Sequence, residues 1–299
     1  MTHSGRSTER RLAEYAGLDC WPDAKILTAM VKSQESAIAA VSNAIPEISK
    51  AATAMAQRIR EGGTLFYAGA GTSIRIGVQD GSELPATFGI PEEQIAYLIA
   101  GGKEAIFESY ADAEDDTEAG ASAGKACSPK DILIAIAASG TTPYTIATAK
   151  MANQRGALVI AVVNNQASPL AAVADIEILL RSGAEVIAGS TRLAAGTAQK
   201  AALNMLTTLT YIKLGAVHDG FMVNVRAGNQ KLKERASGIV AQISGVSEKQ
   251  AATALDQAEG DVKTAVILCA GAKSLSQAKQ LLADTDNNLR LALAQLVDR

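Results

Sequence analysis

The stretch at 62–83 joins a short apolar run to a glycine turn and a helical pattern, and this order constrains the fold more than any other feature. Residues 64–68 favour a buried strand, the glycines at 69–71 break it, and Thr72 and Ser73 stand where the helical pattern begins. Unbonded backbone N–H groups and the helix dipole point the same way at such a helix start, so the stretch predicts a phosphate site. An ordinary strand-to-helix turn explains the same residues equally well.

The same order of strand, turn and helix recurs along the chain. Apolar runs predict further strands at 95–101, 132–137, 158–163 and 176–180. Strands that are apolar throughout and alternate with helices predict an α/β fold with a parallel sheet covered on both faces. Ligands of such folds bind beyond the carboxyl ends of the strands, which is where the hydroxyl-rich turns of this chain fall.

The patterns divide the chain into three parts. Residues 1–26 form a polar, Arg-rich arm that we expect to pack on a neighbour or to stay loose. Residues 27–237 carry the predicted α/β domain, in which Pro85 marks a loop after the helix of the first glycine turn. Residues 238–299 lack strand-like runs and predict a small domain of three or four short helices.

Composition excludes several functions. The 28 Lys and Arg residues against 31 Asp and Glu residues give a net charge of −3, which argues against a nucleic-acid surface. No apolar run approaches a bilayer span, and three scattered cysteines fit a reducing cytoplasmic setting, so we expect a cytoplasmic protein with no membrane partner. With only His3 and His218, a histidine metal site or a Ser-His-Asp triad is nearly excluded.

Hydroxyl groups follow three of the predicted strands and would converge at one edge of the sheet. Hydroxyls and backbone N–H groups at helix starts can hold a phosphate with little positive charge. Each hydroxyl alone is more readily explained as a helix N-cap, and each nearby cation as a solvated side chain. The candidate substrate-binding residues are Gly71, Thr72, Ser73, Arg75, Ser139, Gly140, Thr141, Thr142, Ser190, Thr191, Arg192 and Lys200.

Two carboxylates are candidates for acid/base chemistry. Glu83 stands in the predicted loop beside apolar residues, where desolvation would raise its pKa. Glu114 stands in an acidic cluster whose charges act in the same direction, although a solvent-facing acidic helix start explains that cluster more simply. These patterns predict a sugar-phosphate site with possible acid/base carboxylates, and they do not specify a reaction.

The strings FYAGAGTS, DGSELPATFG, GAEVIAGSTR and AAGTAQKAALNML, together with the AASG-TPY turn, resemble the bacterial N-acetylmuramic acid 6-phosphate etherases. This family is related to the glucokinase regulatory protein and has the sugar isomerase (SIS) fold. The resemblance implies a five-stranded parallel sheet, a C-terminal helical domain similar to ubiquitin-associated modules, and a homodimer that binds a phosphorylated amino sugar. It further implies removal of D-lactate from N-acetylmuramic acid 6-phosphate, with Glu83 matching the proton donor and Glu114 the second acid/base carboxylate. It also implies that neither a metal nor an organic cofactor is needed.

The chain departs from the usual family pattern at three positions. Ile74 replaces a glycine, Thr141 an arginine and Ala194 a lysine, so two cationic groups that the pattern would supply are missing. Two other functions stay open on the same fold. A sugar-phosphate sensor of the glucokinase-regulator type would not require the two glutamates, and a sugar-phosphate isomerase would require a base directed at C1 and C2.

Overall fold

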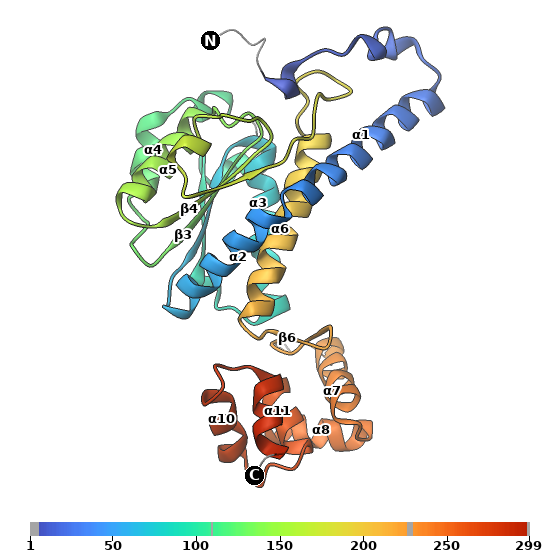
Figure 1. The fold of residues 1–299 in the computed structure, drawn as a ribbon, viewed down its shortest axis with the longest axis vertical. Coiled ribbons are helices and arrows are strands. Elements are labelled where there is room, and N and C mark those ends of the chain that lie inside the picture. The colour runs from blue at the N-terminus through green and yellow to red at the C-terminus, as the bar shows by residue number, and fades with distance from the viewer. Residues whose placement is uncertain (1–5, 109, 226–229, 298–299) are drawn as a thin grey trace. The chain divides into compact units, whose positions relative to one another are not determined.

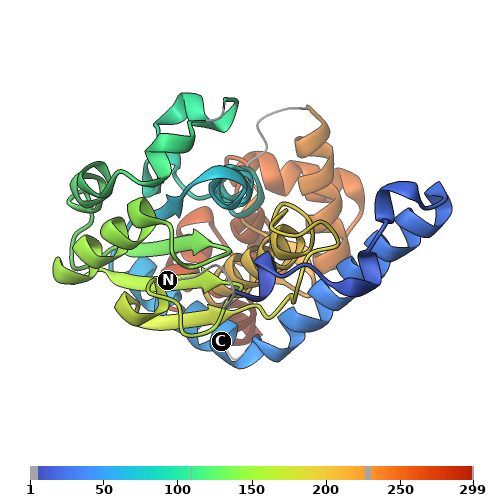
Figure 2. The same ribbon diagram turned by 90° about the horizontal axis from the view of Figure 1, so that it is seen from above.

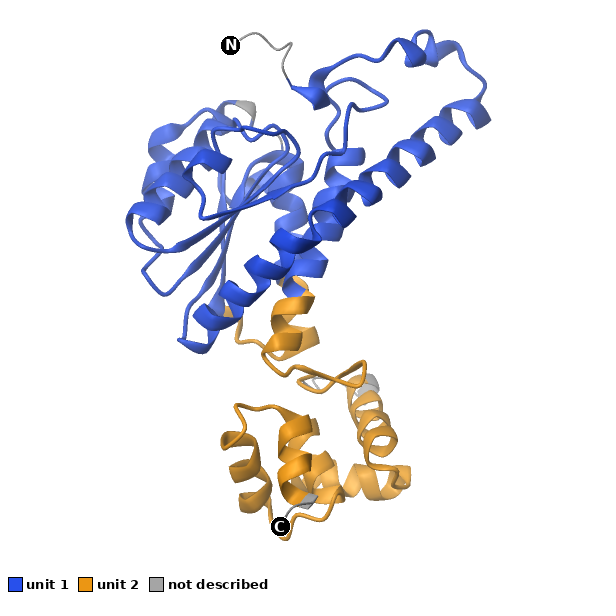
Figure 3. Cartoon of the chain, in the orientation of Figure 1, with its two compact units in different colours: residues 1–81, 93–207 blue, residues 82–92, 208–299 orange. Residues whose placement is uncertain are grey.

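The computed structural model describes residues 6–108, 110–225 and 230–297 (Figure 1). His3 and the first residues of the predicted arm lie outside the described residues. The chain forms two compact units, one of residues 1–81 with 93–207 and one of residues 82–92 with 208–299 (Figure 3). The predicted boundary at 237/238 falls within a helix of the second unit, α7 (Gln230–Ser244).

The first unit contains five parallel strands in the order β2-β1-β3-β4-β5, which confirms the predicted sheet. In the register of the sheet, Leu65 pairs with both Ile95 and Ile132, and Ile132 also pairs with Leu158. The three central strands are buried along their whole length and the two outer strands only in part, as expected for a sheet covered on both faces. The strands are β1 (Leu65–Gly69), β2 (Ile95–Ile99), β3 (Ile132–Ala137), β4 (Leu158–Val163) and β5 (Ile176–Leu179).

Helices cover both faces of this sheet. On one face, α4 (Thr117–Gly124) packs against α5 (Pro143–Gln154), which contacts the central strands, whereas α2 (Ile45–Arg60) contacts β4 and β5 from the other face (Figures 1 and 2). Successive residues of each strand point to opposite faces of the sheet, so alternate residues form the apolar core on each face. The core under α5 consists of Phe66, Ala68, Leu133, Ala135, Val159 and Ala161, among others.

Apolar residues at helical spacing over 27–60 predict helix with a break near Pro46, and the structure has two helices there. Helix α1 (Asp23–Asn43) ends before Ala44, and α2 begins with Pro46 in its first turn. Proline is accommodated there because the N–H group that it lacks would have no partner within the helix. The break is therefore where the sequence indicates it.

Helix α3 (Gly71–Phe88) contradicts the loop predicted around Pro85. The helix continues through this proline, although the ring removes the bond that an N–H group would donate to Gly81. Its buried positions, which include Gly77, Gly81 and Leu84, recur at helical spacing past the proline. Packing of one continuous face therefore outweighs the local cost of the proline, and Glu83 lies in a helix.

Two glycines allow α3 to approach the sheet closely. A Cβ atom on Gly77 would lie 2.9 Å from Ile136 Cδ1, and one on Gly81 would lie 2.7 Å from the Tyr97 hydroxyl and 2.8 Å from Tyr67 Cε2. An alanine at Gly81 would meet two tyrosine side chains and an alanine at Gly77 the movable end of Ile136, so glycine fits this crossing with the least displacement.

The second unit ends in short helices around their own apolar core. This core includes Ile239, Val240, Leu255, Val266, Leu281 and Leu289. A two-residue hairpin of β6 (Val217–His218) and β7 (Phe221–Met222) precedes them. The helices after α7 are α8 (Glu248–Gln257), α9 (Val262–Cys269), α10 (Leu275–Ala283) and α11 (Leu289–Val297).

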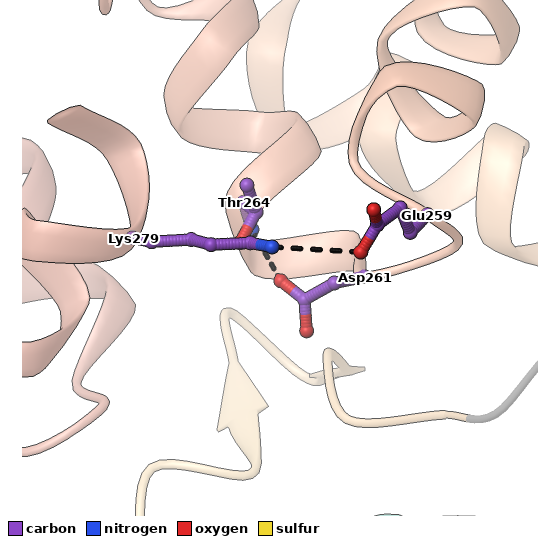
Figure 4. Close-up of polar contacts among 4 residues, drawn as sticks. All are labelled: Glu259, Asp261, Thr264 and Lys279. Carbon is purple, nitrogen blue, oxygen red and sulfur yellow. Dashed lines mark hydrogen bonds and ion pairs between the residues drawn. The ribbon is translucent and has the colours of Figure 1, made fainter. Parts of the chain in front are cut away.

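Side-chain caps define the starts of several of these helices. Asp261 Oδ1 accepts the Thr264 N–H at 2.7 Å at the start of α9, beside the 3.5 Å ion pair of Lys279 with Glu259 (Figure 4). A cap of this kind contributes about 1 kcal/mol, whereas an exposed ion pair contributes less because water screens it. None of the helices in the described part of the chain combines the length and apolar character that crossing a bilayer requires.

Candidate active site

The strand order places a topological switch point between β1 and β3, because the chain leaves β1 towards β2 on one side and later returns to β3 on the other. Open parallel sheets bind ligands in the crevice beyond the carboxyl ends of their strands at such a point. Two of the predicted hydroxyl turns follow these two strands. The structure therefore brings the turns at 69–73 and 138–142 to neighbouring positions on the sheet edge.

The first turn opens α3 directly. Gly71 has a φ of +53°, a left-handed conformation that glycine adopts without strain. Thr72 and Ser73 lie in the first helical turn, where backbone N–H groups have no partner within the helix. Ile74, which replaces the glycine of the family pattern, is 1% exposed and contacts the sheet core. The helix start retains its amides for an anion, while Ile74 serves packing.

Glu114 reaches this helix start from the turn Ala111–Glu114. A Cβ atom on Gly71 would lie 3.3 Å from Glu114 Oε1, so the carboxylate lies against the glycine turn. The dipole of α3 favours an ionised carboxylate here. Partial burial, and secondly the charge of Asp115, nevertheless raise the pKa of Glu114, although much of the side chain is exposed. A carboxyl group with a raised pKa next to an anion site can exchange protons with a bound substrate.

The Arg75 guanidinium is hydrogen-bonded to backbone carbonyls of the segment after β2. Its Nε donates to the Ile106 carbonyl at 2.8 Å, and its Nη2 donates to the carbonyls of Ala105 at 3.0 Å and Glu108 at 3.1 Å. These three bonds engage Nε and Nη2 and hold the segment after β2, whereas the expectation that Arg75 also binds substrate stays a prediction. Glu114 lies at the far end of that segment.

The second turn opens α5. Ser139 Oγ accepts the Thr141 N–H at 3.2 Å and the Thr141 hydroxyl at 2.9 Å, which closes the turn. Thr142 is the N-cap residue, but its side chain makes no capping bond, and Pro143 follows in the first helical turn. A Cβ atom on Gly140 would lie 2.4 Å from the Ser168 side chain, so only glycine fits. The start of α5 thus keeps its amides and the Thr142 hydroxyl for a ligand.

The third turn differs, because a carboxylate of the chain already occupies it. Glu185 is 1% exposed, and its two oxygens accept the N–H groups of Ala194 and Ala195 at 2.9 Å each, at the start of α6 (Ala194–Lys213). Ser190 and Thr191 are half-buried, and Arg192 is exposed. The expected phosphate site at these three residues is therefore weakened by Glu185. No local signal in the sequence identifies Glu185, since its partners follow nine and ten residues later.

Lys200 leads into a polar network rather than standing alone. Its Nζ donates to Asn204 Oδ1, and Asn204 donates to Asp80 Oδ1 at 2.6 Å. Asp80 is 4% exposed and also accepts from the Tyr67 hydroxyl at 2.7 Å and from Thr207 at 3.2 Å. The network ties α6 to α3 and β1 beside the candidate site, and sequence patterns alone do not indicate Asp80.

Ser7 and Thr8 of the N-terminal arm contact the same sheet edge, so this part of the arm is not loose, while packing of the arm on a neighbour stays a prediction. The backbone N–H and the hydroxyl of Ser7 both donate to Asn165 Oδ1 at 2.9 Å, and Gly189 N–H donates to the Thr8 carbonyl at 3.1 Å. Asn165 in turn donates to the Ala138 carbonyl at 3.0 Å. The arm is thus fixed to the loops that follow β3, β4 and β5.

Glu83 lies on the solvent-exposed side of α3. It belongs to the second compact unit, whereas Glu114 and the three turns belong to the first. The pairing of the two glutamates therefore stays a prediction. Within the described ranges, no group of three or more His, Cys, Asp and Glu side chains is placed to hold a metal ion.

A doubly wound parallel sheet with glycine and hydroxyl turns at its switch point is typical of α/β proteins that bind phosphorylated ligands. The comparisons identify this α/β domain as a SIS domain. Residues 104–209 match the SIS domain model, and residues 47–153 match the model for the glucokinase regulatory protein N-terminal SIS domain. A phosphoheptose isomerase from Francisella tularensis has the same fold, with a TM-score of 0.50 and 22% identity over 64% of this chain and 98% of the other.

Relatives that match most of the chain identify a narrower family within the proteins of this fold. The N-acetylmuramic acid 6-phosphate etherase of Deinococcus radiodurans is 41% identical over 97% of this chain and 96% of its own length. That of Symbiobacterium thermophilum is 44% identical over 87% of both chains. The chain belongs to the N-acetylmuramic acid 6-phosphate etherase family, which confirms the resemblance drawn from its motifs.

Proposed function

We propose that this protein is a carbon-oxygen lyase that cleaves the D-lactyl ether of N-acetylmuramic acid 6-phosphate. The products are N-acetylglucosamine 6-phosphate and D-lactate, and the reaction serves cell-wall sugar recycling in the cytoplasm. The observation that carries the proposal is the 41% identity to an etherase over 97% of this chain. The position of Glu114 against a glycine turn at the switch point supports it.

Two helix starts are available for the substrate's phosphate. The start of α6 is the poorer choice because Glu185 already accepts its first amides. The start of α5, with Thr142 making no capping bond, combines unbonded amides with hydroxyls. We therefore place the phosphate beside Ser139, Gly140, Thr141 and Thr142, and the reacting part of the sugar towards Gly71, Thr72 and Ser73.

The reaction is an elimination followed by hydration. Glu114, as the base, takes the proton at C2 of the open-chain sugar while the bond from C3 to the ether oxygen breaks. Glu83, as the acid, protonates that oxygen, and lactate departs with it. Water then adds at C3 of the unsaturated aldehyde and supplies the new hydroxyl. The raised pKa of Glu114 suits a group that takes up and returns a proton.

The acting form is proposed to be a homodimer. Leu27, Val31 and Ile38 recur at helical spacing on α1 and are 60%, 56% and 47% exposed. An apolar stripe of this kind on a long helix favours burial against another copy. We also keep the division into an arm at 1–26, a sugar-phosphate domain at 27–237 and a helical domain at 238–299 as a proposal.

Lactate release from N-acetylmuramic acid 6-phosphate tests the function. The wild-type protein should release stoichiometric lactate, and Glu83→Gln and Glu114→Gln should each lose most of the turnover, by about 100-fold or more for a missing acid or base. Glu118→Gln, an exposed change near Glu114 on α4, is the matched control. Full turnover in either site variant would refute the assigned role.

A regulator that binds the sugar phosphate without turnover is the second candidate. The match of residues 47–153 to the glucokinase regulatory protein domain favours it. Binding of the substrate to wild-type protein without lactate release, measured by calorimetry, would select this function over the lyase.

A further inference from the structure

The segment that carries Glu114 has little apolar support of its own. The sequence predicts that residues 105–119 are helical or begin a helix, whereas the chain forms two short turns, Lys103–Ile106 and Ala111–Glu114, before α4. Ala105 is buried, but Phe107 is 92% exposed. A segment with so few buried side chains is held in place mainly by its polar contacts.

Arg75 supplies such contacts from the second turn of α3. Its three bonds, at 2.8 to 3.1 Å, go to backbone carbonyls at 105, 106 and 108. A planar guanidinium with several donors can hold carbonyls in a fixed geometry, and a lysine ammonium cannot reproduce that geometry. The contacts anchor the beginning of the segment to the helix whose N-terminus faces Glu114.

The anchored turn and the residue before Glu114 both lie against Gly101. A Cβ atom on Gly101 would lie 3.2 Å from the Cβ atoms of Ala105 and Tyr110, and 3.3 Å from that of Ala113. The segment thus folds back on itself, so that the residue before Glu114 packs beside the turn that Arg75 holds. Displacement of that turn would move the carboxylate away from Gly71.

We propose that Arg75 is a positioning residue, which acts on the reaction by holding the 103–108 turn and thereby keeping the Glu114 carboxylate against the start of α3. This inference rests on the proposed function for its kinetic part. It assigns Arg75 a role different from phosphate or carboxylate binding.

The charged and titratable groups around Glu114 include Asp112 and Asp116 of the acidic cluster, and Glu104, Glu108 and Tyr110 of the same segment. Asp115 adjoins it in sequence, Arg75 faces the segment from α3, and Tyr144 lies on α5, which packs against the Ala111–Glu114 turn. Burial raises the pKa of Tyr144 as well. Looser packing would hydrate Glu114, so its pKa would fall towards the ordinary value.

The test compares Arg75→Met and Arg75→Lys with Arg155→Met. Arg155 is the matched control because its Nε likewise donates to a backbone carbonyl, that of Cys127 at 2.6 Å, at the end of α5 opposite the site. We expect Arg75→Met to lower kcat by about 10- to 100-fold, part of what a well-placed base contributes, with KM changed less than about 3-fold. The fall in kcat should be smaller in Arg75→Lys than in Arg75→Met.

The pH profile separates positioning from general destabilisation. Glu114 acts as a base when ionised, so the rate falls below its pKa, and the acidic limb of kcat should move to lower pH in Arg75→Met. The limb should stay in place in Arg155→Met. A rise in KM of the same size as the fall in activity, with an unmoved limb, would overturn the proposal and make Arg75 a substrate ligand.

Hydrogen exchange of the wild type and Arg75→Met gives a readout that does not require turnover. Amides at 103–108 should exchange faster in the variant, while amides of β3 and β4 should not. Unchanged exchange at 103–108 would overturn the proposal whether or not the protein releases lactate. Absence of lactate release from the wild type with this exchange pattern would instead reject the lyase function alone.

Discussion

Glu185 is the residue whose removal should cost the first unit most for a single polar change. It is 1% exposed and accepts two backbone N–H groups at 2.9 Å, and Ala194 and Ala195 are themselves fully buried. Bonds to a charged partner contribute about 1.5–3 kcal/mol each, so Glu185→Ala should lower the free energy of unfolding by about 3–6 kcal/mol. This is a large share of the roughly 5–15 kcal/mol that holds a domain folded.

Urea unfolding followed by far-ultraviolet circular dichroism measures this loss in the transition that unfolds α6. Glu185→Gln keeps one acceptor oxygen, so its free energy of unfolding should fall less than that of Glu185→Ala. Glu118→Ala, an exposed acidic residue in the first turn of α4, is the control and should lose less than about 1 kcal/mol. A loss below about 1 kcal/mol in Glu185→Ala would refute the idea that this carboxylate secures the start of α6.

Further predictions concern close packing and one buried amine. Gly81→Ala and Gly77→Ala should each destabilise the protein by about 1–3 kcal/mol, with the larger loss in Gly81→Ala. The new methyl group meets the rigid ring of Tyr97 in Gly81→Ala and the movable Cδ1 of Ile136 in Gly77→Ala. Equal urea midpoints of the two variants would contradict this prediction. Lys263 is 3% exposed and donates to a backbone carbonyl, and burial lowers its pKa to about 8 from 10.5. Between pH 8 and pH 10.5 the Lys263 amine is therefore protonated in the unfolded chain and neutral in the folded one. The free energy of unfolding of the second unit should rise over this range, by at most about 3 kcal/mol. Lys263→Met should flatten that rise.

The sequence indicates the sheet well because its strands are continuous apolar runs with clear ends. The predicted ranges 132–137 and 158–163 coincide with β3 and β4. The loop predicted at Pro85 is wrong because a local breaker cannot reveal that the same helical face continues to pack beyond it. Local rules describe a segment before its tertiary contacts are known.

The sequence indicates the candidate site less completely than the sheet, because contacts of the site join residues that are far apart in the chain. Ser139 and Thr142 stand in a turn that the sequence shows directly. Arg75 was expected at the ligand because a cation near a glycine turn suggests an anion, but its partners are carbonyls some 30 residues further along the chain. Contacts between distant backbone groups leave no periodic signal in a single sequence.

The three helix starts at the sheet edge are alike in sequence and different in structure. The start of α6 is neutralised by Glu185, and moving that carboxylate aside would leave a buried charge without its donors, at a cost of several kcal/mol. The start of α3 faces Glu114, whose pKa is raised by partial burial and by the charge of Asp115. The start of α5 keeps its amides beside Thr142. One helix start therefore stabilises the fold, and under the proposed function the start of α3 would serve proton transfer and the start of α5 would bind the phosphate.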